Sequence, residues 1–141
     1  MKKFIALLMT SAFVLTGCGS SGQTTEEAVE KYGSATLKFY NWGEYIGDDV
    51  ISNFENEYGV DVISEYFDSN EAMYTKLQAG DTYDVLVPSD YMIERLMNED
   101  MLQPIDKSVV TNLGNLADGV KNLEYDPDNT YSVPYFWGNV G

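Results

Sequence analysis

Residues 83–91 read Tyr83-Asp84-Val85-Leu86-Val87-Pro88-Ser89-Asp90-Tyr91, an apolar run that ends at a proline and is followed by capping side chains. A continuous apolar run of this length is typical of a strand buried on both faces of a parallel sheet. Pro88 ends the strand because it has no N–H to donate to the ladder. Ser89 or Asp90 then caps a helix whose apolar stripe is Met92, Ile93, Leu96 and Met97. The stretch predicts an α/β fold.

The preceding residues predict the same alternation of strand and helix. Residues 36–41 alternate apolar and polar side chains like a strand, and residues 48–58 have helical spacing that stops at Gly59. Residues 60–67 predict a second strand, and residues 71–79 a helix that is capped by residues 68–70 and ends at Gly80. With right-handed crossovers, the helices of this βαβαβα order flank a mostly parallel sheet, and the first and third strands end at one edge.

An aromatic and polar cluster follows the first predicted strand, and another follows the third. Both clusters are therefore expected at the carboxyl edge of the sheet, where open α/β sheets bind ligands. The candidate ligand-binding residues are Trp42, Glu44, Tyr45, Ser89 and Tyr91. Aromatic faces attract an ammonium group, and a carboxylate accepts its N–H donors. Rings for the methylene groups and a carboxylate for the amine fit a flexible polyamine.

Other readings of the same residues stay open. A sugar also stacks on aromatic rings and donates hydroxyl groups to carboxylates, so a carbohydrate-binding protein or carbohydrate-active enzyme is the alternative. Trp42 and Tyr45 could instead pack a loop at the strand end, Ser89 could be only a helix cap, and Tyr91 could belong to the core. A surface lipoprotein with a structural or adhesive role is a third hypothesis.

The N-terminus predicts export. Residues 1–17 have the basic start and apolar run of a signal peptide. Residues 15–18 resemble the bacterial lipobox, in which the cysteine is lipidated, so Cys18 is the expected membrane anchor at the extracytoplasmic face (the periplasm or its equivalent). Residues 18–35 are small and polar, with the composition of a flexible tether. Residues 36–141 form the expected globular lobe.

Charge and composition exclude several functions. The formal net charge is −15, and without Lys2 and Lys3 the remaining 6 basic and 23 acidic residues give −17. Such a surface argues against nucleic-acid partners. The chain has no histidine, so Ser89 has no partner for a hydrolase triad, and neither a metal nor a cofactor is expected.

Residues 126–129 faintly resemble a calcium loop but lack its glycine and distal glutamate, so a turn is expected. An enzyme is the least supported class, although Glu44 with Asp84 or Asp90 would provide two carboxylates for a glycosidase pair.

Four segments closely resemble the spermidine/putrescine-binding proteins of bacterial ABC importers, in the order found in that family. They are residues 39–45 (FYNWGEY), 68–74 (DSNEAMY), 83–91 (YDVLVPSDY) and 131–138 (YSVPYFWG). The resemblance implies a type II periplasmic-binding-protein fold, whose two lobes close on a polyamine that is then delivered to a membrane permease. It also implies that the protein is not an enzyme.

The family's first aromatic and acidic motif falls on Trp42, Glu44 and Tyr45, and its second falls on Ser89 and Tyr91. Gly43 departs from members with a hydroxyl residue there, and Asp90 departs from members with a neutral one, which bears on the choice among polyamines. Family chains are about twice as long or longer, so the sequence is expected to be the N-terminal lobe, with the second lobe missing and only half of the cleft present.

Overall fold

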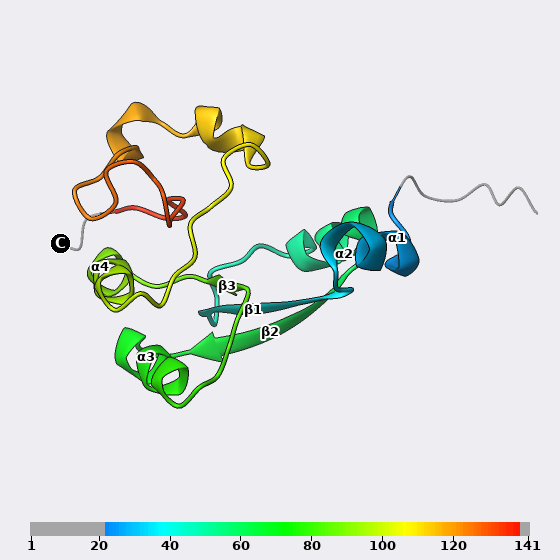
Figure 1. Cartoon of the computed structure of the whole chain (residues 1–141), viewed down its shortest axis with the longest axis horizontal. Coiled ribbons are helices and arrows are strands. Elements are labelled where there is room, and N and C mark those ends of the chain that lie inside the picture. The colour runs from blue at the N-terminus through cyan, green and yellow to red at the C-terminus, as the bar shows by residue number, and fades with distance from the viewer. Residues whose placement is uncertain (1–21, 139–141) are drawn as a thin grey trace, which may run out of the picture.

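The computed structural model describes residues 22–138, so the expected signal peptide (residues 1–17) and the expected lipidation site Cys18 lie outside the described residues. Helices and strands alternate along the first part of this region, and two short 3-10 helices follow (Figure 1). The elements are α1 (Thr25–Tyr32), β1 (Thr36–Trp42), α2 (Val50–Tyr58), β2 (Asp61–Phe67), α3 (Asn70–Gln78), β3 (Val85–Leu86), α4 (Asp90–Asn98), η1 (Thr111–Asn115) and η2 (Asp118–Val120).

The three strands form one parallel sheet in the order β2-β1-β3. β1 pairs with β2 over its full length, from Thr36 opposite Asp61 to Trp42 opposite Phe67. On its other side β1 pairs with β3 only through Phe39 and Tyr40. The predicted α/β fold, with a mostly parallel sheet and a βαβαβα order, is confirmed for the residues from Thr36 to Asn98.

The hydrophobic core lies between the sheet and the helices α3 and α4. Tyr40 of β1 is 2 % exposed, and its ring stacks on that of Tyr83 at 4.4 Å between centroids. The buried members of this cluster are Tyr40, Phe67, Met73, Tyr74, Met92 and Leu96. Figure 1 shows α3 and α4 near the carboxyl ends of the strands, and α1 and α2 toward the amino ends.

The third strand is shorter and more exposed than its apolar run predicts. Only Val85 and Leu86 pair as a strand, and Val85 is 43 % exposed. The expectation of burial on both faces is therefore wrong for this strand. β3 is an edge strand of the described sheet, and the core helices cover only the face that carries Tyr40 and Leu86.

The expected tether also needs correction, because residues 25–32 within it form α1. Thr24 and Glu27 make a capping box, and Ala28 is fully buried. The Gln23 N–H donates to the Glu57 carbonyl at 2.9 Å, which docks the start of α1 on the end of α2. Gly59 permits this approach: its φ is +67°, and a Cβ there would lie 2.5 Å from the Thr24 carbonyl oxygen.

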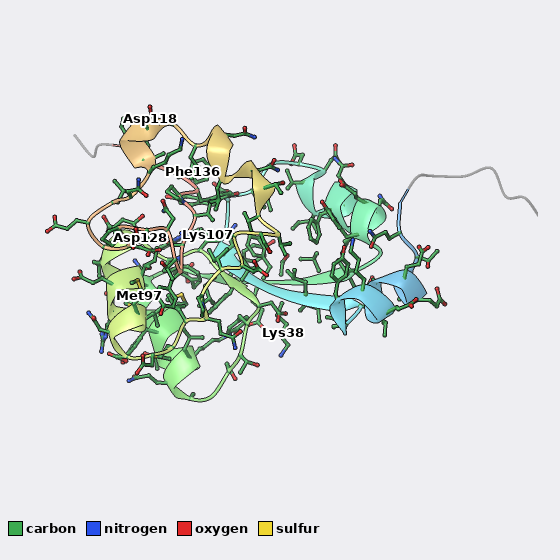
Figure 2. All side chains as sticks on the ribbon, turned by 45° about the horizontal axis from the view of Figure 1, so that its top comes forward. Lys38, Met97, Lys107, Asp118, Asp128 and Phe136 are labelled. Atoms are coloured by element: carbon green, nitrogen blue, oxygen red, sulfur yellow. The ribbon has the colours of Figure 1, made fainter. Side chains whose placement is uncertain are left out.

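Residues 126–129 form a turn, as expected, and Asp126 organises it. The Asp126 carboxylate is 2 % exposed and accepts hydrogen bonds from the backbone N–H groups of residues 130–132 and from the Ser132 hydroxyl, at 2.8–2.9 Å. The Lys107 ammonium donates to the Asp128 carbonyl of the same turn, and Figure 2 shows these two residues side by side.

No helix between residues 22 and 138 has the length and apolar character needed to cross a bilayer. In the same part of the chain, no three acidic, histidine or cysteine side chains gather into a group able to hold a metal ion.

We expect Asp126→Asn to lower the free energy of unfolding by about 2 kcal/mol, because an amide cannot accept from all the donors that face this carboxylate. Urea denaturation at pH 7 measures the loss. Asp128→Asn is the matched control: it lies in the same turn, its carboxylate accepts no hydrogen bond among the described contacts, and its replacement should change stability little.

The loss should depend on pH. Burial raises the pKa of Asp126, but the hydrogen bonds from residues 130–132 lower it more, so the pKa lies below its usual value. The stabilisation is therefore complete above the unfolded pKa of about 3.9 and is lost as the pH falls through the lower folded pKa. A difference between wild type and Asp126→Asn that stays constant from pH 7 to pH 3 would contradict this account.

Candidate ligand-binding site

The two aromatic and polar clusters lie side by side at the carboxyl edge of the sheet, as the strand order predicts. β1 and β3 are neighbours, so the residues that follow them share this edge. The Trp42 indole N–H donates to the Val87 carbonyl at 2.8 Å and ties the end of β1 to the segment that leads into α4. Since Trp42 and Val87 are 45 positions apart in the chain, this bond joins the two clusters directly.

Trp42 packs partly on the core and partly faces outward. Its ring lies 4.4 Å from that of Phe67 and 5.9 Å from that of Tyr45, between centroids. Tyr45 is 46 % exposed, and Glu44 is exposed beside it. Glu44 forms no ion pair with any residue between 22 and 138. The loop therefore presents two aromatic rings and an uncompensated carboxylate to solvent.

Ser89 occupies the N-cap position of α4, but its hydroxyl makes no capping hydrogen bond. The Asn70 side chain at the start of α3 holds it instead. The Asn70 amide nitrogen donates to Ser89 Oγ at 2.9 Å, and the Ser89 backbone N–H donates to Asn70 Oδ1 at 3.0 Å. Asn70 is 5 % exposed. Ser89 therefore stands at the N-cap position, but its hydroxyl is bonded to Asn70 and does not cap the helix.

Tyr91 lies on the surface rather than in the core, with 51 % of its area exposed. Its hydroxyl donates to the Glu71 carboxylate at 3.0 Å. Partial burial raises the pKa of Tyr91, and the hydrogen bond to Glu71 raises it further. Glu71, like Glu44, forms no ion pair within the described part of the chain. Two carboxylates that lack basic partners therefore belong to this edge.

The segment near residue 136 adds a further aromatic layer over the first loop. The Tyr135 hydroxyl donates to the Tyr45 carbonyl, and the ring of Phe136 lies 5.2 Å from that of Tyr45 in an edge-to-face arrangement. The four contributors that sequence reasoning did not place at the site are Asn70, Glu71, Tyr135 and Phe136. All four belong to segments singled out in the sequence, but nothing local to them signals contact with residues 45, 89 and 91.

Asn41, between the core residue Tyr40 and Trp42, is fully buried. Neither its amide nitrogen nor its amide oxygen has a hydrogen-bond partner among the described residues. A buried amide of this kind costs free energy until it is paired. The site edge therefore adjoins an unpaired polar group at the end of the central strand.

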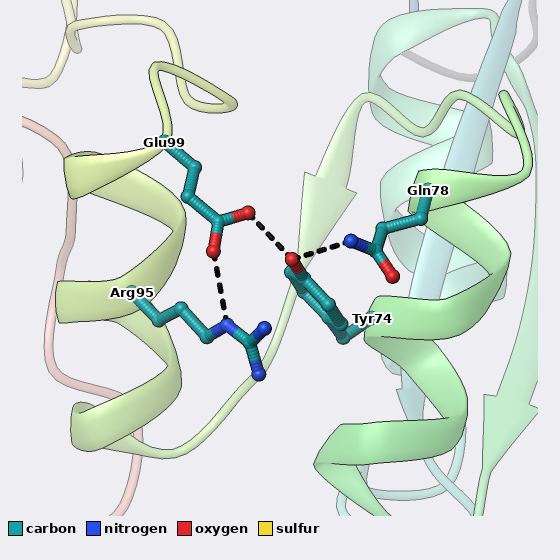
Figure 3. A network of polar contacts seen from close by, with 4 residues as sticks. All are labelled: Tyr74, Gln78, Arg95 and Glu99. Carbon is teal, nitrogen blue, oxygen red and sulfur yellow. Dashed lines mark hydrogen bonds and ion pairs between the residues drawn. The ribbon is translucent and has the colours of Figure 1, made fainter.

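A polar network fixes α3 against α4 at the ends of the helices far from Asn70 and Ser89 (Figure 3). The Tyr74 hydroxyl donates to Glu99 at 2.6 Å and accepts from Gln78 at 2.6 Å. The Arg95 guanidinium lies 3.8 Å over the Tyr74 ring and pairs with Glu99 at 3.0 Å. With both ends held, the N-termini of the two helices keep a fixed spacing at the site.

Two surface hollows, of about 310 and 260 Å³, lie elsewhere on the molecule. One is lined by residues that include Lys107 and Lys121, and the other by residues that include Lys38 and Asp84. Neither is lined by any of the five predicted site residues. The side chains at the carboxyl edge together provide aromatic faces and hydrogen-bond acceptors for a cation.

Residues 49–141 match the protein family described as bacterial extracellular solute-binding protein. The spermidine/putrescine-binding periplasmic protein of Escherichia coli K12 is 45 % identical over 105 residues, which are 73 % of this chain and 30 % of the relative. The putrescine/cadaverine-binding protein of Pseudomonas aeruginosa is 34 % identical over 128 residues, which are 90 % of this chain and 35 % of that relative. The chain thus spans about a third of the length of these relatives.

Solved structures show the same likeness. The spermidine/putrescine ABC transporter substrate-binding protein of Streptococcus pneumoniae matches with a TM-score of 0.71 at 47 % identity, over 74 % of this chain and 33 % of that one. A lipoprotein of Treponema pallidum matches with a TM-score of 0.68 at 36 % identity, over 72 % and 32 %. By name these relatives are binding components rather than enzymes, and the carbohydrate alternative finds no support among them.

We expect Trp42→Phe to lower the free energy of unfolding by about 1 kcal/mol, because phenylalanine keeps a ring against Phe67 but cannot donate to the Val87 carbonyl. Denaturant titration followed by circular dichroism measures the change. Trp137→Phe is the matched control, since Trp137 is 75 % exposed. Equal stability of the two variants would show that the indole hydrogen bond does not hold the two clusters together.

Proposed function

This chain belongs to the bacterial extracellular solute-binding proteins, and we propose that the full-length protein captures a polyamine, such as spermidine or putrescine, and delivers it to the permease of an ABC transporter. The observation that carries the proposal is the carboxyl edge of the sheet. Trp42, Glu44, Tyr45, Ser89 and Tyr91 lie there on the ends of neighbouring strands and the start of α4. The similarity to named polyamine-binding proteins supports the same substrate class.

The chemistry of the edge suits a polyamine in particular. A polyamine is a chain of cationic nitrogens joined by methylene groups. Each nitrogen needs a hydrogen-bond acceptor in the site, and the methylene groups need apolar surfaces to pack on. An ammonium over a Trp or Tyr ring gains about 0.5–2 kcal/mol, depending on how much water is excluded. Glu44 adds an opposite charge, and hydrogen bonds to charged groups are worth about 1.5–3 kcal/mol. Exclusion of water requires a cover over this open edge, and a second lobe that closes on the first provides one.

The proposed assignments of residues follow from these contacts. Trp42 and Tyr45 form stacking walls, Glu44 binds an amine, and Ser89 and Tyr91 orient the chain of the ligand from α4. The solved structures that match this chain support a periplasmic-binding-protein lobe as the scaffold. In this proposal residues 36–141 are the N-terminal lobe, and no cofactor or nucleic acid takes part.

We also propose that residues 1–17 are a signal peptide and that Cys18 carries a lipid that anchors the protein at the extracytoplasmic face. A lipoprotein among the structural relatives supports this. Gln23 already docks on α2, and the five residues from Cys18 to Gly22 reach at most about 18 Å. The amino edge of the sheet, near α1 and the end of α2, would then stay close to the membrane, while the site lies at the opposite edge.

Calorimetric titration of putrescine and spermidine into the full-length protein should show saturable binding, and Glu44→Gln should weaken it at least about tenfold because a charged acceptor is lost. Trp42→Ala should weaken it as well. Glu30→Gln on α1 removes the same charge far from the site and is the control. Binding of a sugar from a test panel, with no heat from either polyamine, would contradict the proposal.

Replacement of Cys18 by alanine should move the protein from the membrane fraction to the soluble extracytoplasmic fraction, because the thiol that carries the lipid is lost. Metabolic labelling with a fatty acid followed by fractionation measures this. Polyamine affinity should not change, since the described chain begins beside α2, at the edge of the sheet opposite to the site. Membrane retention of the alanine variant, or absence of label from the wild type, would rule the anchor out.

A further inference from the structure

The start of α3 carries none of the predicted site residues, yet it holds two of them in place. Asn70 pairs with Ser89 through two hydrogen bonds, and Glu71 accepts one from Tyr91. These contacts cross from α3 to the start of α4. They therefore set how the α4 residues face the carboxyl edge, and they determine which atoms of those residues remain free for a ligand.

The proton of the Tyr91 hydroxyl points to Glu71. Tyr91 is the donor in that bond, at 3.0 Å, because a carboxylate can only accept. Only the lone pairs of the Tyr91 oxygen then remain to bind another group. Tyr91 is 51 % exposed, so a hydrogen-bond donor of a ligand can reach it. An ammonium group has donors only, so a tyrosine held in this way matches a cation and offers no donor to an acceptor such as a sugar ring oxygen.

The orientation of Asn70 is equally determined. Its Oδ1 must face the Ser89 backbone N–H, which can only donate, so its amide nitrogen faces Ser89 Oγ. This bond draws the Ser89 hydroxyl away from the free N–H groups of α4, where an N-cap serine ordinarily binds. Asn70 is buried and donates one hydrogen bond to Oγ, so the other lone pair and the proton of Ser89 stay available at the edge.

We propose that Asn70 and Glu71 are positioning residues that fix Ser89 and Tyr91 and set the hydrogen-bond polarity with which these two residues meet a ligand. The inference rests on the proposed polyamine function and extends it: at Tyr91 the preference for N–H donors over groups that need a donor comes from Glu71, while Asn70 sets the position of the Ser89 hydroxyl, and neither α3 residue needs to touch the ligand. The network of Tyr74, Gln78 and Glu99 keeps the same two helices at a fixed spacing at their other ends.

A double-mutant cycle on the full-length protein tests the role of Glu71. Glu71→Ala should weaken spermidine binding about fivefold in the wild type, the scale of one hydrogen bond, and should have no effect once Tyr91→Phe has removed the hydroxyl. Glu30→Ala is the matched control for the lost charge. The same factor in both backgrounds would overturn the proposal, because Glu71 would then act on the ligand by its own charge.

The corresponding cycle for Asn70 uses Asn70→Ala and Ser89→Ala. The loss of affinity from Asn70→Ala should largely disappear when Ser89 is already alanine, and full additivity would overturn the role of Asn70. Asn70 is buried, so circular dichroism and the urea midpoint must first show that its variant is folded. If the variant does not fold, hydrogen exchange at the Ser89 backbone amide of the wild type provides the test. Rapid exchange at that amide would overturn the role of Asn70, because it would show that Asn70 does not hold Ser89.

A measurement without ligand separates this proposal from the proposed function. NMR titration of labelled tyrosine rings should show that the pKa of Tyr91, which burial and Glu71 raise, falls toward its usual value in Glu71→Ala and is unchanged in Glu30→Ala. An unchanged Tyr91 titration in Glu71→Ala would overturn the positioning role even if polyamines bind. A wild type that binds no polyamine but shows the shift would reject the proposed function and support the positioning of Tyr91.

Discussion

The parallel pairing of β1 with strands on both of its sides is the constraint on which the rest of the structure depends. β2 comes second in the chain and β3 third, yet β1 lies between them. The pairing with β3 is short, and neighbouring contacts extend it: Asp84 and Val87 donate their N–H groups to the Lys38 and Tyr40 carbonyls at 3.0 and 3.1 Å. Because β3 returns beside β1 rather than beside β2, the segments after β1 and β3 meet at one edge.

The two helices beside that edge act as a pair. Side chains at the start of α3 hold the start of α4, and a second network with Tyr74 at its centre holds their far ends. Both helices pack on the hydrophobic core that includes Tyr40 and Met92. Helices tied at two points cannot rotate freely about one contact, so the site residues on α4 keep their orientation even though much of their surface is exposed.

The charge distribution complements this geometry. The described residues include six basic side chains, and three of them pair with Glu65, Glu99 and Asp118, none of which is a predicted site residue. Within residues 22–138, Glu44 and Glu71 form no ion pair, and they lie beside exposed aromatic rings. The chain has a net charge of −15, so its electrostatic field attracts cations. The carboxylates of Glu44 and Glu71 can then bind a cation at the carboxyl edge.

The sequence predicted the parts of the fold that local chemistry controls. Helical and strand periods placed α2, β2, α3 and α4, and Gly59 ends α2 as expected, with its N–H bonded to the Glu55 carbonyl. The alternation of strands and helices was enough to bring Trp42 and Ser89 to one edge, because crossover handedness leaves few arrangements. The α1 helix was missed, since a composition typical of a tether concealed the capping box at Thr24 and Glu27.

The sequence by itself therefore determined the α/β order, the carboxyl edge and the residue types gathered there, because each depends on neighbours within a few positions. Only the tertiary structure decided which distant side chains complete the edge. Asn70 meets Ser89 across 19 positions, and Tyr135 meets Tyr45 across 90. It also left Val85 exposed on an edge strand. Such contacts depend on how packed helices and loops cross in space, and no local period or composition encodes that crossing.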